Sequence, residues 1–219
     1  MSHNFPKIIW QTHNYTLDSM PDHVKMVCAN WINLNPGWEY RYVDHIEREK
    51  FVSGYPELLN YYLAATPKVQ SDIWRCLVTY EYGGSYADMD SVCIKPIEDM
   101  LKEIDDGVEL VLVPKEFNDG SPGIGNYIVK EKSDILYSVI QKLYNAGKFK
   151  DLWEEEWLAF DLFISSFKDR ENISYSFTSA RHSSGYHDVF PSDLEISFFG
   201  KTVTYDSFIK DNNLKNKYW

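Results

Sequence analysis

Cysteine is scarce in this chain of 219 residues. Its three cysteines, Cys28, Cys76 and Cys93, lie far apart and form no CxxC pair. That spacing argues against a cysteine-rich zinc site and against a disulfide-stapled scaffold. Cys76 falls on the apolar face of a predicted helix, and Cys93 falls within a strand-like run. We therefore expect all three to be reduced core residues in a reducing compartment.

Long hydrophobic runs and an excess of positive charge are also missing. No segment approaches the roughly 20 apolar residues of a membrane span. The first residues, MSHNFPKIIWQ, lack the basic and apolar parts of a secretion signal. The net charge is −11, so nucleic acid and anionic membrane surfaces are unfavourable partners for the molecule as a whole. We expect a soluble, cytoplasmic protein without a membrane span or a nucleic-acid partner.

The composition that is present suits one folded domain. Hydrophobic residues make up 44% of the chain and aromatic residues 16%, which is enough for one sizeable core, so we expect residues 1–219 to form a single domain. Predicted strands alternate with predicted helices, which favours an α/β domain with a mostly parallel central sheet. The strands are expected at 7–10, 38–43, 108–113 and 127–129, the helices at 18–34, 45–52, 57–64, 134–146 and 151–168, and a glycine-rich loop at 116–125.

One stretch, KVQSDIWRCLVTYEYGGSYADMDSVCIKP at 68–96, organises the rest. Its first half has apolar residues at helical spacing. Asp72, Arg75 and Thr79 recur at i, i+3 and i+7, so they share one stripe of that helix. Gly83 and Gly84 then supply the left-handed residues that commonly end a helix.

The chain is predicted to become extended after the two glycines. Side chains alternate along a strand, so we expect Tyr86, Asp88 and Asp90 to point to one side. Two carboxylates on one side repel each other, and a cation between them relieves that repulsion. The alternative is that Asp88 and Asp90 are solvated turn residues, and that Asp72 and Arg75 form only a surface ion pair.

Three segments together resemble a known family. PKIIWQTH, NPGWEYRYVD and KVQSDIWRCLVTYEYGGSYADMDSVCIKPI are similar to the sugar-transferring domain of glycosyltransferase family 32. That family includes capsular-polysaccharide and α-mannosyl transferases and is related to glucosylating toxins. The ordered set SD-x-x-R, Y-GG-x-Y-x-D-x-D and C-x-KP carries the resemblance, which is strong over residues 5–97.

The resemblance implies a GT-A fold, a Rossmann-like α/β domain that binds a nucleotide sugar. It implies retaining transfer of a hexose from a UDP- or GDP-sugar to a glycan or other hydroxyl acceptor, with Mn²⁺ or Mg²⁺ as cofactor. Residues 5–97 would hold the nucleotide sugar and metal, and 98–219 would form the acceptor side and tail. By position, Asp88 and Asp90 match the metal-binding DxD motif. The resemblance also implies that Asp72, Arg75 and Asp90 are the catalytic residues. The donor contacts that it implies come from Gln11, Thr12, Asp44, Asp72, Arg75, Tyr86 and Asp88.

Other interpretations stay open at this point. His187, in GYHDVFP, is a candidate for a further metal or phosphate ligand. DMDSV also resembles the nucleophile motif of haloacid-dehalogenase-type phosphatases, in which Asp88 would form a phosphoenzyme. A third possibility is a catalytically inactive module that only binds sugar nucleotides. Turnover against a panel of nucleotide sugars distinguishes the three.

Overall fold

The protein is built around a six-stranded sheet with the order β2-β1-β3-β6-β5-β7. The computed structural model describes residues 4–93, 95–105, 107–114, 122–149, 158–167, 173–175, 180–182, 195–198 and 201–204. β1 is parallel to β2 and β3, β5 is parallel to β7, and β6 runs antiparallel to its neighbours β3 and β5. The predicted mostly parallel sheet is therefore confirmed. Its strands are β1 (Ile8–Thr12), β2 (Glu39–Val43), β3 (Gly84–Ala87), β5 (Leu110–Pro114), β6 (Pro122–Val129) and β7 (Ile173–Tyr175).

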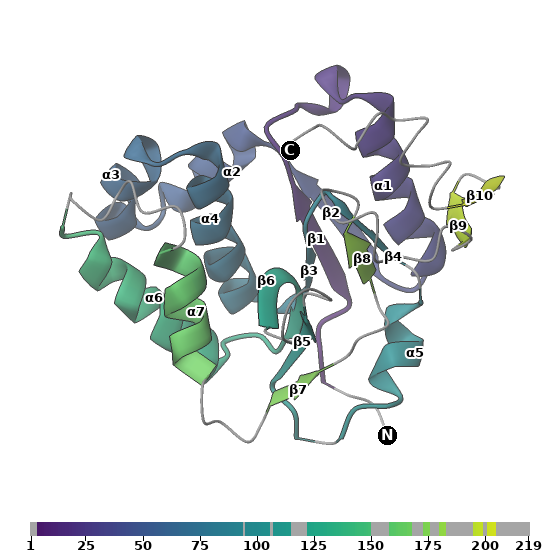
Figure 1. The fold of residues 1–219 in the computed structure, drawn as a ribbon. Helices are drawn as coiled ribbons and strands as arrows, with labels where there is room; N and C mark the ends of the chain where they lie inside the picture. The colour runs from purple at the N-terminus through teal and green to yellow at the C-terminus, as the bar shows by residue number, and fades with distance from the viewer. Residues whose placement is uncertain are drawn as a thin grey trace.

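Helices cover both faces of this sheet (Figure 1). One face carries α1 (Asp22–Leu34) and α5 (Ile97–Leu101), and the other carries α2 (His45–Val52), α3 (Pro56–Ala64), α4 (Pro67–Tyr82), α6 (Asp134–Ala146) and α7 (Leu158–Phe167). A 3-10 turn, η1 (Leu17–Ser19), precedes α1. Two strand pairs lie outside the main sheet: β4 (Ser91–Cys93) with β8 (Ala180–His182), and β9 (Glu195–Phe198) with β10 (Lys201–Thr204).

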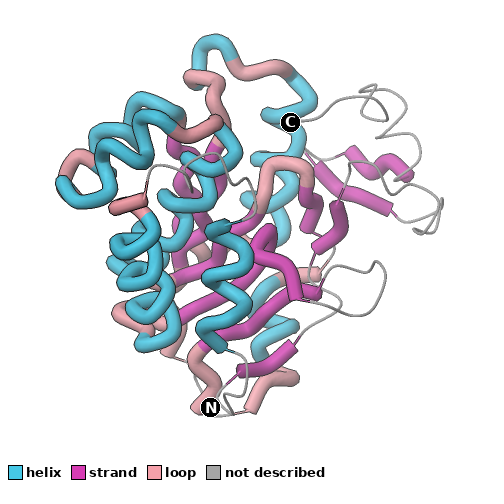
Figure 2. Tube along the Cα trace, turned by 60° about the vertical axis from the view of Figure 1, so that its left-hand side comes forward, coloured by secondary structure: helices cyan, strands magenta, loops and turns pink. Residues whose placement is uncertain are grey.

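The sheet separates two hydrophobic cores. Side chains alternate along β1, so Ile9 enters the core beneath α1 while Trp10 enters the core beneath α4. Figure 2, turned from the first view, shows the strands crossing behind the layer of helices that includes α4 and α6. Among the described helices, none has both the length and the apolar character needed to cross a bilayer.

Helix α4 has clear signals at both ends, and its glycine stop is the one that the sequence predicts. Thr66 caps its first turn, its side chain accepting a hydrogen bond from the Val69 amide. Gly83 and Gly84 follow at φ 61° and 97°, a region that side chains with a Cβ rarely adopt. A Cβ at Gly84 would also lie 2.5 Å from the Ile8 carbonyl oxygen. The glycines therefore let the chain leave α4 and pass directly into β3 beside β1.

Two local predictions were wrong. The extended run after Gly84 ends at Ala87, and Asp88 to Asp90 form a turn that the Ser91 amide closes by donating to the Asp88 carbonyl at 3.1 Å. The same-face argument for Asp88 and Asp90 as strand residues therefore fails. Residues 122–125, expected in a loop, belong to β6, whose pairing with β5 reaches back to Pro122 opposite Pro114.

Candidate functional site

Arg75 is the centre of a buried polar cluster at the carboxyl end of β3. Its Nη2 atom lies 2.8 Å from Asp72 Oδ1 and 3.0 Å from Asp88 Oδ1. Its Nη1 atom donates to the Ile124 carbonyl at 2.8 Å, and the guanidinium lies over the Tyr86 ring, 4.3 Å from the centroid. Only 5% of Arg75 is exposed, so the interpretation of Asp72 and Arg75 as a surface ion pair is wrong.

The protonation states in this cluster follow from its charges. Burial by itself would lower the pKa of Arg75, but Asp88, Tyr86 and Asp72 hold that pKa well above its usual value. Burial raises the pKa of the Tyr86 phenol well above its usual value, and the negative charge of Asp88 raises it further. Tyr86 therefore stays protonated, and its hydroxyl donates to Asp88 Oδ1 at 2.9 Å.

The turn that carries the two DxD aspartates is held from the sheet side. The Asp88 amide donates to the Gly125 carbonyl of β6 at 2.7 Å, and Gln11 Nε2 donates to the Asp88 carbonyl at 3.2 Å. Asn126, also on β6, donates from Nδ2 to Ser91 Oγ at 2.9 Å. Strands β1 and β6 therefore fix the main chain on which Asp88 and Asp90 sit.

Helix α1 holds the other side of the same segment. Asn30 makes two hydrogen bonds with Cys93 in β4: its Nδ2 donates to the carbonyl at 3.0 Å, and its Oδ1 accepts from the amide at 2.6 Å. Trp31 Nε1 donates to the Ser91 carbonyl at 2.9 Å. These groups are buried, so side chains of α1 satisfy main-chain groups of β4 that its pairing with β8 leaves to other partners.

The remaining predicted site residues take different positions. Gln11 is fully buried and also accepts a hydrogen bond from the Tyr40 hydroxyl. Thr12 donates to the Val43 carbonyl at 2.5 Å, and Asp44 caps α2 by accepting from the amides of its first turn. All three lie where β1 and β2 end, with side chains engaged in local structure. His187 lies outside the described residues.

A metal site must be judged from the carboxylates of the turn. Asp88 and Asp90 are both partly exposed, and they offer the hard oxygen ligands that Mg²⁺ and Mn²⁺ prefer. Across the described ranges there is no group of three or more His, Cys, Asp or Glu residues arranged to hold a metal ion. The donor set thus fits a divalent cation that takes its other ligands from a phosphate-bearing substrate and water.

Sequence reasoning missed the part that β6 takes in this site. Ile124 and Gly125 contribute only carbonyl groups, to Arg75 and to the Asp88 amide. A main-chain contact has no residue signature, and the sequence predicted the run PGIGNYIV as the end of a loop followed by a short strand. Its pairing with β3 places Asn126 opposite Ala87, directly before the turn.

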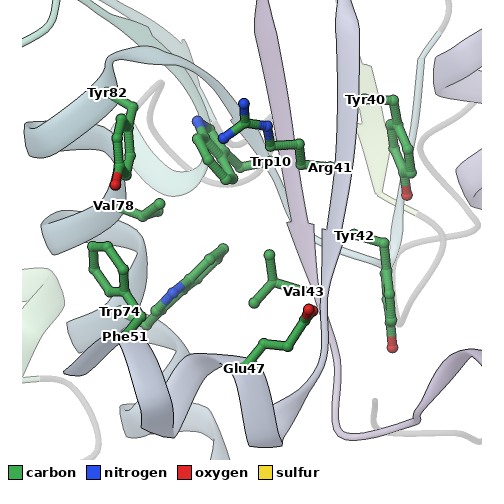
Figure 3. A pocket seen from close by; sticks show the side chains of 10 residues that line it. All are labelled: Trp10, Tyr40, Arg41, Tyr42, Val43, Glu47, Phe51, Trp74, Val78 and Tyr82. Atoms are coloured by element: carbon green, nitrogen blue, oxygen red, sulfur yellow. The ribbon is translucent and has the colours of Figure 1, made fainter. Parts of the chain in front are cut away.

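A separate pocket of about 470 Å³ lies along the edge strand β2. Figure 3 shows Trp10, Arg41 and Val43 facing Phe51 and Trp74 across it, with Tyr40 and Tyr42 directed away. The Trp74 ring also contacts the Tyr86 ring, with centroids 6.5 Å apart. None of the predicted donor residues lines this pocket, so it is distinct from the Arg75 cluster.

Comparison with known proteins shows that this cluster lies within a region shared with a known family. Residues 21–106 match a family described as the glycosyltransferase sugar-binding region containing a DXD motif. The chain carries that sugar-binding region. The matched residues include Asp72, Arg75, Tyr86 and both DxD aspartates, and the resemblance to family-32-type glycosyltransferases is confirmed there.

Curated relatives match the same part of the chain. Inositol phosphoceramide mannosyltransferase 2 of Schizosaccharomyces pombe is 36% identical over 98 residues, which cover 44% of this chain and 28% of the relative. The initiation-specific alpha-1,6-mannosyltransferase of Candida albicans is 28% identical over 104 residues, covering 44% of this chain and 27% of the relative. The match thus spans little more than a quarter of the length of these relatives.

A solved structure supports the fold over a larger part of the chain. The PaToxG glycosyltransferase superposes with a TM-score of 0.53 at 16% identity, covering 77% of this chain and 71% of that one. At this identity the likeness concerns the fold alone. Together with the sheet order and its two helical layers, it confirms the α/β fold of the GT-A class that the sequence resemblance implies.

Proposed function

We propose that this chain transfers a hexose from a nucleotide-sugar donor to a hydroxyl group of a glycan or other acceptor, with retention of configuration. One observation carries the proposal: Arg75 is held between Asp72 and Asp88 at the carboxyl end of β3. Ligands of open α/β sheets bind at the carboxyl ends of the strands. The match to the DXD sugar-binding region covers the same residues.

Each residue of the cluster has a separate task in this proposal. Asp72 and Asp88 orient the planar guanidinium of Arg75, which leaves its direction fixed before a ligand arrives. Arg75 then stabilises negative charge on the departing diphosphate and directs the donor sugar. Asp72 accepts hydrogen bonds from sugar hydroxyls. Tyr86 keeps Asp88 in position through its hydroxyl.

Asp88 and Asp90 would hold the divalent cation, Mn²⁺ or Mg²⁺. Since Arg75 and Tyr86 already contact Asp88 Oδ1, we assign Asp90 as the principal protein ligand. A bound cation of this kind neutralises charge that develops on the nucleoside diphosphate. Two curated relatives are named mannosyltransferases, so nucleotide-activated mannose comes first in the donor panel.

The decisive experiment measures release of nucleoside diphosphate from a panel of UDP- and GDP-sugars, with simple glycans as acceptors. We expect turnover with one donor in the presence of Mn²⁺, loss of turnover in EDTA, and recovery when Mn²⁺ is restored. Asp90→Asn should lower turnover by about 10²–10³-fold, as removal of a preorganised charged group does in other enzymes. The melting temperature of this variant should stay close to that of the wild type.

The other outcomes would redirect the assignment. Full turnover in chelator would contradict the metal role of Asp88 and Asp90. Release of inorganic phosphate from phosphomonoesters, abolished by Asp88→Asn, would favour the phosphatase interpretation. Binding of a nucleotide sugar without turnover would identify an inactive binding module.

A further inference from the structure

Arg48 on α2 is a fully buried charge with unusual surroundings. None of its surface is exposed. Its Nη1 atom donates to Ser71 Oγ and its Nη2 atom donates to Asn14 Oδ1. Its Nε atom has no hydrogen-bond partner. Both acceptors are neutral, so neither of these hydrogen bonds balances the positive charge.

A carboxylate close to the guanidinium would balance this charge. Among the ion pairs of the described residues, none includes Arg48. Burial lowers the pKa of Arg48, with the phenol of Tyr62 the foremost group that opposes this shift. A buried charge without an ionic partner destabilises a fold, and proteins usually pair such charges. Arg75, which is almost as deeply buried, has two carboxylate partners. The two arginines therefore differ in how their charge is compensated.

The position of Arg48 suggests what would compensate it. Asn14 follows the carboxyl end of β1, and Ser71 directly precedes Asp72 in α4. Figure 1 shows α2 beside α4 and next to the strand pair β1 and β2. Asn14 is exposed although it binds Arg48, so the guanidinium lies directly below the surface at the ligand-binding edge of the sheet.

We propose that Arg48 is a donor-site residue whose buried positive charge is balanced by the anionic nucleoside diphosphate part of the donor. The proposal rests on the proposed function, and it adds a second cationic group to the site beside Arg75. In the free protein its two hydrogen bonds reach Asn14 after β1 and Ser71 in α4, and both acceptors are neutral. On donor binding, the charge of the ligand completes its environment.

The proposal predicts that replacing Arg48 affects stability and nucleotide binding in opposite directions. A buried charge without an ionic partner carries a desolvation cost that an apolar side chain of similar size avoids. Arg48→Met should therefore melt at the same temperature as the wild type, or higher, when no ligand is present. Titration with UDP and with GDP, each with Mn²⁺, should show a dissociation constant raised by about 10-fold or more, as expected for a lost charged interaction. Arg48→Lys, which keeps a charge without the planar fork, should fall between the two.

Arg41→Met is the matched control. Arg41 on β2 lies over the Trp10 ring, 5.0 Å from its centroid, beside the pocket of Figure 3. Its side chain is 40% exposed and pairs with Glu39. We expect this variant to bind both nucleotides as the wild type does.

Each contrary outcome has a distinct meaning. A loss of stability or failure to fold in Arg48→Met, or an unchanged dissociation constant, would make Arg48 a structural tie and overturn the inference while leaving the proposed function intact. If the wild type itself bound neither UDP nor GDP with Mn²⁺, the proposed donor class would fail, and the assignment of Arg48 with it.

Discussion

Two neighbouring contacts on one carboxylate oxygen set the geometry of the candidate site. Asp88 Oδ1 accepts a hydrogen bond from the Tyr86 hydroxyl at 2.9 Å and pairs with Arg75 at 3.0 Å. Arg75 and Tyr86 are buried and the acceptor is a carboxylate, so both contacts are stronger than hydrogen bonds between neutral groups in water. The orientation of Asp88 is thus fixed by its neighbours before any ligand binds.

Tyr86→Phe tests this geometry without opening a cavity. The change removes only the hydroxyl that donates to Asp88, so we expect turnover to fall by about 10-fold, equivalent to ~1.4 kcal/mol in the barrier. The free energy of unfolding should fall by about 1–3 kcal/mol, since the lost hydrogen bond involves a charged acceptor. Steady-state kinetics and urea unfolding measure the two effects.

Tyr127→Phe is the control for that change. Tyr127 stacks on Tyr86 with ring centroids 5.7 Å apart, and its hydroxyl donates to the Arg75 carbonyl at 3.1 Å. The Tyr127 hydroxyl bonds Thr79 and the Arg75 main chain, whereas the Tyr86 hydroxyl bonds the Asp88 carboxylate, so this variant should lose stability but keep turnover. Equal turnover losses in the two variants would show that general loosening of the core, and not the Asp88 contact, limits activity.

At the scale of elements, α1 and β4 form a unit through side-chain to main-chain hydrogen bonds. Asn35 extends the contacts that Asn30 and Trp31 make: its Nδ2 donates to the Trp31 carbonyl at 2.9 Å, and its Oδ1 accepts from the Ile97 amide at 2.8 Å. The asparagine at the end of α1 therefore also fixes the start of α5. The DxD turn is bounded on one side by β3 and on the other by a strand anchored in this way.

Asn30→Ala should weaken the whole fold. The change leaves the buried amide and carbonyl of Cys93 without the partners they have now, so we expect the free energy of unfolding to fall by about 2–4 kcal/mol. Urea titration measures this loss. The slope of the unfolding free energy against urea concentration should stay the same as in the wild type. Asn145→Ala, at an exposed position of α6, should stay within about 0.5 kcal/mol of the wild type. A similar result for Asn30→Ala would contradict the anchoring role of α1.

At the scale of the whole molecule, two hydrophobic cores on opposite faces of one sheet stabilise the fold. Cys28 and Cys93 belong to the core beneath α1, and Cys76 belongs to the core beneath α4. All three are free and buried, as the sequence predicts. Burial raises the pKa of Cys28 to about 11 and the pKa values of Cys76 and Cys93 to about 12.

These thiols give a readout of global unfolding. The thiolate is the reactive form, so the native protein should react very slowly with a thiol reagent at pH 8 and expose all three thiols in denaturant. A thiol whose pKa is raised in the folded state favours folding fully below the unfolded pKa, which is near 9.0. That contribution is lost as the pH rises from about 9 through the folded values, so the urea midpoint should fall over this range. Fast labelling of the native protein at pH 8 would contradict the buried placement.

Local periodicity determined a large part of this protein from the sequence alone. The helical stripe of Asp72 and Arg75, the glycine stop at Gly83 and Gly84, and the buried thiols each depend on residues within a few turns of one another. The ordered motif of the sugar-binding region can also be found in the sequence, through its resemblance to a known family. For Asp72 and Arg75 the period of 3.6 residues settles that they share a face, whereas the period of 2 does not hold at Asp88 and Asp90.

Only the tertiary structure decided what surrounds those residues. The Ile124 carbonyl meets Arg75 across 49 positions, and Asn30 meets Cys93 across 63. The turn at Asp88 to Asp90 forms because β6 pairs with β3 up to Ala87 and its Gly125 carbonyl then accepts from the Asp88 amide. The burial of Arg48, which forms no ion pair within the described ranges, likewise follows from how α2 packs on α4. Sheet pairing and helix packing over such separations leave no period in the sequence, because they depend on the order of the strands and not on neighbouring residues.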